Sequence, residues 1–69
     1  METLDLHGVR HNKVRVLVEN FVLTKSLPVK IITGNSVMMK NIVKAVLEEH
    51  GLRFSPENDW NLHAWIIDD

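Results

Sequence analysis

The sequence predicts an α/β fold with two layers and the element order βαβαββ. Short segments of alternating or β-branched residues interleave with two longer segments whose apolar residues recur at three- and four-residue spacing. All three glycines and both prolines fall between these segments. With 69 residues, of which 45% are hydrophobic, the chain has room for one compact domain, residues 1–69.

The N-terminal third of the chain predicts a strand followed by a helix. Residues 3–7 alternate in polarity, which turns Leu4 and Leu6 towards a core and Asp5 and His7 towards the opposite side. After Gly8, apolar residues at helical spacing predict a helix from about residue 10 to residue 24. Its apolar face consists of Val14, Leu17, Val18, Phe21 and Val22.

The rest of the chain predicts a second strand, a second helix and a final strand pair. The β-branched run 29–33 is typical of a buried strand, and residues 36–50 keep helical spacing, with Asn35 or Ser36 as the N-cap and Gly51 at the end. Met38 and Met39 are expected to fill gaps under this helix. Strands are expected over 52–54 and 62–67, joined by the turn-forming segment 56–61.

Right-handed crossovers place both helices on one face of the sheet and leave the other face open. His63, Trp65 and Ile67 share one side of the last strand. On the open face they would form a stacking surface for bases or a dimer patch, and on the helix-covered face Trp65 would belong to the core, which is its expected place. Trp60 lies in the loop before that strand. It could cover the sheet edge or stack on a nucleobase, and the sequence does not decide between these two roles.

Composition excludes several classes of function. The chain has no cysteine, which excludes a disulfide framework, a thiolate nucleophile and cysteine-based metal sites. The apolar runs are far shorter than the roughly 20 residues that cross a bilayer. The N-terminus lacks the layout of a signal peptide. We therefore expect a soluble, cytoplasmic protein without a membrane partner.

The charge is unevenly distributed along the chain. The net charge of −1 argues against a domain that neutralises many phosphates of long duplex DNA. Residues 1–46, however, contain seven lysines and arginines against three acids, whereas residues 47–69 contain one arginine and six acids. One end of the domain could therefore contact a polyanion while the other end avoids it.

Two turns are predicted at the edge of the sheet where strands end and helices begin, the usual ligand-binding edge of parallel βαβ units. They are His7-Gly8 and the turn at residues 33–36. Helix N-termini favour anions, and cations there cost about 0.3–1 kcal/mol each. The first helix nevertheless begins with Arg10, His11 and Lys13 and no acid, which indicates a bound phosphate or, alternatively, simply solvated side chains.

Asp5 and His7 are the candidate catalytic pair. They are two residues apart on a strand, so their side chains project to the same side. A carboxylate can orient an imidazole that exchanges a proton near neutral pH, although such a pair can equally serve only to stabilise the turn. The histidines lack a known metal-ligand spacing, so no structural metal is expected. A catalytic Mg²⁺ or Mn²⁺ is left open, with Asp5 as its one clear ligand.

Residues 4–8, Leu-Asp-Leu-His-Gly, match the LDLHG signature of the Smr domain, the small MutS-related module, and the chain resembles that family over nearly its whole length. Thr33-Gly34 lies where the family has its second signature, TGxG or HGxG. The resemblance implies a fold like the C-terminal domain of a translation initiation factor, with strand order 1-2-4-3 and an antiparallel fourth strand.

The resemblance also implies nucleic-acid binding and, as in several members, endonuclease activity on DNA or RNA. Asp5 and His7 would be catalytic, and Gly8, Thr33 and Gly34 would shape a phosphate pocket. The nucleic-acid-binding set predicted from both arguments is Gly8, Arg10, His11, Lys13, Thr33, Gly34, Asn35, Ser36 and Lys40.

The chain departs from the second signature at Ser36, where members have glycine. Serine there can cap a helix and bond a phosphate oxygen, which binding tolerates better than catalysis does. Two alternatives therefore stand beside the nuclease: a non-catalytic module that binds structured nucleic acid, and an interaction module whose open face binds another protein or forms a weak homodimer.

Overall fold

Six elements follow one another in the order βαβαββ in the computed structural model, which describes all 69 residues. They are β1 (Thr3–Asp5), α1 (His11–Thr24), β2 (Val29–Ile32), α2 (Val37–Glu49), β3 (Arg53–Pro56) and β4 (Ala64–Asp68). The predicted fold class and element order are confirmed.

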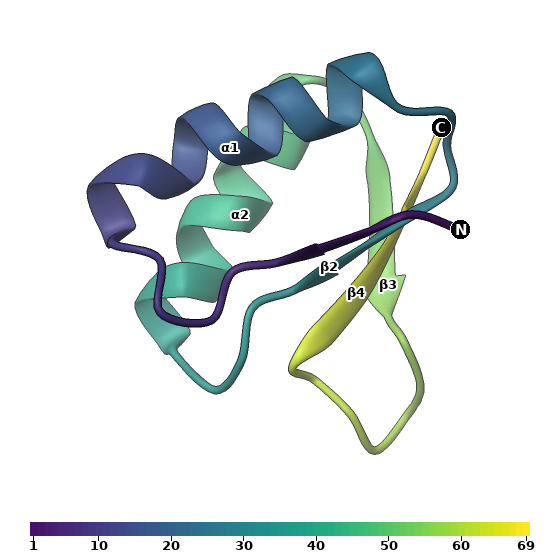
Figure 1. The fold of residues 1–69 in the computed structure, drawn as a ribbon. Coiled ribbons are helices and arrows are strands. Elements are labelled where there is room, and N and C mark those ends of the chain that lie inside the picture. The colour runs from purple at the N-terminus through teal and green to yellow at the C-terminus, as the bar shows by residue number, and fades with distance from the viewer.

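The four strands form one mixed sheet with the order β1-β2-β4-β3. β1 and β2 are parallel, and β4 runs antiparallel to both of its neighbours, β2 and β3. Both helices pack on the same side of this sheet (Figure 1). The strand order and the antiparallel fourth strand agree with the expectation from the motifs.

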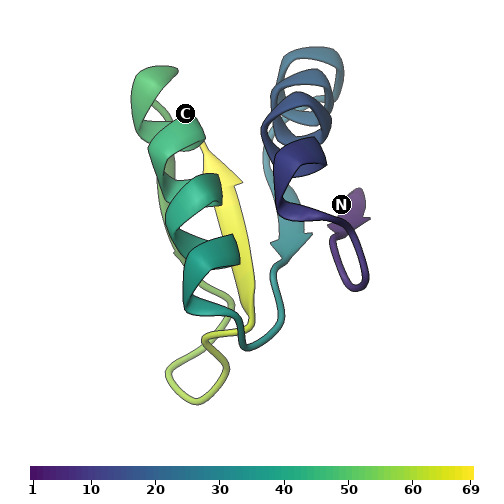
Figure 2. The same ribbon diagram turned by 90° about the vertical axis from the view of Figure 1, so that its left-hand side faces the viewer.

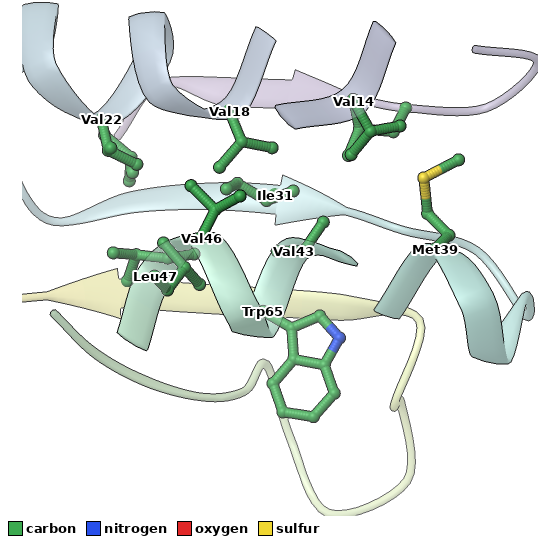
Figure 3. Packing of buried hydrophobic residues seen from close by; sticks show 12 residues of the cluster. Val14, Val18, Val22, Ile31, Met39, Val43, Val46, Leu47 and Trp65 are labelled. Carbon is green, nitrogen blue, oxygen red and sulfur yellow. The ribbon is translucent and has the colours of Figure 1, made fainter. Parts of the chain in front are cut away.

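The core lies between the helices and one face of the sheet (Figure 3). Strand alternation turns Val29 and Ile31 of β2 to this face, and the register places Trp65 and Ile67 of β4 opposite them. Trp65 is therefore a core residue, as predicted. The twelve buried residues of the cluster are Leu6, Val14, Val18, Val22, Val29, Ile31, Met39, Val43, Val46, Leu47, Trp65 and Ile67.

Two predicted core positions are wrong. Leu17 is exposed at the margin of the helix face, because α1 packs through Val14, Val18 and Val22, which are spaced by four residues. Met38 is exposed as well, whereas Met39 is buried with Val43. Adjacent helical residues point about 100° apart, so only one of the two methionines can face the sheet.

The element boundaries differ from the predicted ones by a few residues. β1 ends at Asp5 and not at His7, because the Asp5 carboxylate accepts the His7 main-chain N–H and begins a turn there. β2 ends at Ile32, one residue before the predicted end. β3 extends to Pro56, which was predicted in the turn, and β4 begins at Ala64, two residues later than predicted.

Ser36 and Gly51 mark the two ends of α2. Ser36 is the N-cap of α2, and its Oγ accepts the main-chain N–H of Met39 at 3.1 Å. Gly51, with φ of +68°, follows the helix, in the left-handed region that favours glycine. No helix of the structure is long and apolar enough to cross a membrane.

Ion pairs join the two helices on their outer surface. Arg15 of α1 donates two hydrogen bonds to Glu49 of α2, at 2.5 and 3.1 Å, and these lower the pKa of Glu49. His50 lies 3.2 Å from a carboxylate oxygen of Glu19. His50 therefore links the helices in addition to lying at the end of α2, the role expected from the sequence.

Candidate functional site

The starts of both helices and the ends of β1 and β2 meet at one edge of the domain (Figure 2). Figure 2 looks along the helices from this edge, so the turns that precede α1 and α2 lie towards the viewer. The pairing of β1 with β2 continues past the strand, since Leu6 donates its N–H to the carbonyl of Ile32 at 2.9 Å. The two turns therefore leave the sheet from adjacent, fixed positions.

Asp5 holds His7 in one orientation. Oδ1 of Asp5 accepts the His7 main-chain N–H at 2.9 Å and lies 3.0 Å from the imidazole Nδ1. Both hydrogen bonds lower the pKa of Asp5 below its ordinary value, and the one from the main-chain N–H has the larger effect. An ionised carboxylate only accepts hydrogen bonds, so Nδ1 carries the proton between them. Nε2 of the neutral ring then keeps a free lone pair.

The imidazole of His7 lies against the second turn. A β-carbon added at Gly34 would lie 3.2 Å from His7 Nε2, closer than such a group normally comes to a neighbour. Gly34 also has φ of +70°, which side chains rarely adopt. Glycine is therefore required at this position for two reasons, and the two sequence motifs meet at Nε2 of His7.

This contact predicts that Gly34→Ala impairs the site more than it impairs the fold. Positive φ costs a non-glycine residue about 1–2 kcal/mol, and the new methyl group must also displace the imidazole. Gly51→Ala is the matched control, because Gly51 has the same backbone conformation with open space around it. Urea denaturation should show similar losses for both variants, whereas the His7 imidazole NMR signals should shift only in Gly34→Ala. Unchanged His7 signals in that variant would contradict the packing described.

The second turn is tied to the loop that precedes β4. The carbonyl of His63 accepts the N–H groups of Thr33 at 2.7 Å and Gly34 at 3.1 Å. Thr33 is buried, and its hydroxyl lies 3.2 Å from the same carbonyl. Thr33 therefore shapes the turn and does not present its hydroxyl to a ligand. The sequence could not reveal the role of His63, because the group involved is a main-chain carbonyl.

The remaining polar residues of this turn stay accessible. Asn35 is exposed and Ser36 is half-buried. Ser36 uses its Oγ as an acceptor for the helix, so its O–H can still donate to a ligand oxygen. The expected capping role is confirmed, and it leaves one donor available at the start of α2.

Unpaired positive charge gathers at the same edge. Arg15, Lys25 and Lys30 have carboxylate partners. Lys44 lies over the ring of Trp65, and Arg53 donates to the carbonyl of Asp69. The other three of the eight lysines and arginines form no ion pair, and all three lie in or beside the first turns of the helices: Arg10, Lys13 and Lys40.

The start of α1 is open as well as positive. Arg10 occupies its N-cap position without a side-chain hydrogen bond, and the first turn contains no acid. His11, the first helical residue, is exposed. The first N–H groups of the helix and its dipole therefore add to the positive potential of the side chains.

No protein-family model, curated protein or solved structure matches this chain. The function proposed below therefore depends on the geometry of these residues and on the two short motifs.

The side chains at this edge do not by themselves form a metal site. No group of three or more histidine, aspartate or glutamate side chains is placed to hold one, so His11 does not join Asp5 and His7 as a third ligand. Asp5 is the one carboxylate of this pair of turns, and its Oδ1 is already engaged by His7. Mg²⁺ is usually held by carboxylates together with phosphates and waters, and one shared carboxylate is a weak basis for such a site.

Proposed function

We propose that this chain is an Smr-like nucleic-acid-binding domain that holds a phosphate at the edge between the starts of α1 and α2. One observation carries the proposal: the three lysines and arginines that have neither an ion pair, a hydrogen bond nor a contact over an aromatic ring all belong to this edge, and they are Arg10, Lys13 and Lys40. Unpaired cations at helix N-termini are unfavourable alone, and a phosphate makes them favourable. A cytoplasmic location belongs to the proposal, because the ligands are intracellular polymers.

The same edge can also serve phosphodiester cleavage in RNA. Nε2 of His7 would take the proton of a ribose 2′-hydroxyl, whose oxygen then attacks the adjacent phosphorus. The bond from phosphorus to the 5′-oxygen breaks, and that oxygen takes up a proton from water, which leaves a 2′,3′-cyclic phosphate. The imidazolium of His7 then returns its proton to the solvent. Asp5 stabilises the imidazolium that forms. No step requires a metal ion, in keeping with the donor set.

Binding is tested through its dependence on salt. The logarithm of the binding constant for single-stranded nucleic acid falls linearly with the logarithm of the salt concentration, with a slope of about 0.7 for each phosphate that the protein neutralises. The double variant Arg10→Ala/Lys13→Ala should therefore reduce this slope by about 1.4 when each side chain contacts one phosphate. The measurement is fluorescence anisotropy of a labelled short RNA over a salt series.

The control is Lys25→Ala, which removes one positive charge at the far end of α1, where Lys25 pairs with Glu2. Its salt slope should equal that of the wild type. Equal weakening by the control, or no binding to any RNA or DNA, would refute the assigned surface. Binding without cleavage would retain the binding proposal and remove the nuclease.

A further inference from the structure

We propose that Trp60 is a stacking platform for an unpaired nucleobase, so that the preferred ligand is single-stranded or contains an unpaired base next to the bound phosphate. The inference rests on the proposed nucleic-acid function and specifies its ligand class. It decides between the two roles that the sequence left open for Trp60.

The indole of Trp60 has no role in the folded domain. It is 92% exposed, whereas Trp65 is 8% exposed and packs edge-to-face with Phe54. Burying an aromatic side chain stabilises a folded domain by several times RT. A domain this small has few aromatic side chains and little stability to lose by leaving one exposed to water. Trp60 does not cover the sheet edge, so its apolar surface is available to a ligand.

The loop that carries Trp60 is held by its own hydrogen bonds. Asn58 Oδ1 accepts the main-chain N–H groups of Trp60 at 2.9 Å and Asn61 at 2.7 Å. Asn61 donates to Glu57 Oε1 at 3.2 Å and accepts the N–H of His63 at 2.9 Å. The indole therefore projects from an ordered turn, and a base that stacks on it does not have to order the loop first.

The loop is attached directly to the site. His63, three residues after Trp60, accepts the N–H groups of Thr33 and Gly34 through its carbonyl. Three residues span at most about 11 Å, so the Cα atom of Trp60 lies within that distance of the Cα atom of His63, whose carbonyl contacts the turn. Figures 1 and 2 both show the loop between β3 and β4 next to the turn that precedes α2. A nucleotide chain bound at this turn can thus extend to Trp60.

Exposed apolar and positive groups lie on the two segments that the His63 carbonyl joins, the Trp60 loop and the turn that leads into α2. Leu62 in the same loop and Val37 and Met38 at the start of α2 are exposed apolar residues. Lys40 follows in the same helix without an ion pair. Proteins that bind single-stranded nucleic acid stack its bases on aromatic and apolar side chains and hold its phosphates with lysine and arginine. Bases inside a duplex are already stacked on both faces, so they cannot also stack on the indole.

The experiment compares a short single-stranded RNA with a fully paired, blunt-ended RNA duplex of the same sequence, both labelled and measured by anisotropy. Trp60→Ala should weaken binding of the single strand by at least about five-fold, since stacking is worth about 1–3 kcal/mol per base. Trp60→Phe should restore most of this loss, and the duplex should bind the wild type and both variants alike. The control is Leu23→Ala, which removes an exposed apolar side chain at the opposite end of α1.

The possible outcomes distinguish a failure of the stacking proposal from a failure of the nucleic-acid-binding proposal. Single-strand binding that depends on Arg10 and Lys13 but is unchanged in Trp60→Ala would overturn the stacking role alone. A wild-type protein that binds neither oligonucleotide would overturn both. Equal weakening of the single strand by Leu23→Ala would also overturn the stacking role, since the loss would then not be specific to the indole.

Discussion

RNA cleavage is expected to fall by about 10²- to 10⁴-fold when His7 is replaced by alanine, the usual contribution of a positioned acid or base. His7 is largely exposed, so this variant should fold normally. The measurement is the rate of cyclic-phosphate product formation from a short RNA in the presence of a chelator. Added imidazole should restore part of the rate, because it replaces the missing base.

Asp5→Asn should reduce the same rate by less than His7→Ala does. The amide keeps an oxygen that can accept the His7 main-chain N–H, but it loses the charge that stabilises an imidazolium. Because the pKa of Asp5 is lowered from 3.8, its carboxylate stays ionised above that pH, and no loss of rate from its protonation is expected there.

His50→Ala is the matched control for a histidine near a carboxylate, since His50 lies beside Glu19 at the end of α2 away from the site. It should leave cleavage unchanged. An unaltered rate in His7→Ala would remove the catalytic role, while the binding proposal would be unaffected.

Ile31→Ala is expected to lower the free energy of unfolding by about 2–5 kcal/mol. Ile31 is fully buried on β2, the strand between β1 and β4, and lies under both helices (Figure 3). A domain of this size has a total stability of about 3–10 kcal/mol, so the substitution should remove a large part of it. Urea denaturation followed by circular dichroism measures the loss.

Val16→Ala is the control for that experiment. Val16 is an apolar β-branched residue as well, but it is exposed on the outer side of α1. Its replacement should change the stability by no more than about 0.5 kcal/mol, and alanine favours the helix. Equal losses in the two variants would show that the core is not where the structure places it.

The chemical character of the candidate site could be predicted from the sequence. Asp5 and His7 are two residues apart, and this short separation is sufficient to pair them even though His7 lies in the turn that follows β1. The cations at the start of α1 are also a local feature, since helix and charge can both be assigned from neighbouring residues. The absence of an acid in that turn needed no tertiary information.

Residues that depend on packing could not be placed in the same way. Leu17 and Met38 have the apolar character of core residues, and only the docking angle of each helix leaves them in water. Trp60 and Trp65 are chemically identical, and one is exposed whereas the other is buried. The difference arises because Trp65 lies on a strand face that α2 covers, and Trp60 lies in a loop that nothing covers.

The order of the elements and the Asp5–His7 pair could be predicted from the sequence, because each depends on residues a few positions apart. The contact of Gly34 with His7, and the His63 carbonyl that joins the Trp60 loop to the same turn, became visible only in the folded chain. These contacts connect residues about thirty positions apart. They depend on a main-chain carbonyl and on the absence of a side chain at Gly34, neither of which gives a recognisable pattern in the sequence. Chain crossover and strand pairing bring them together.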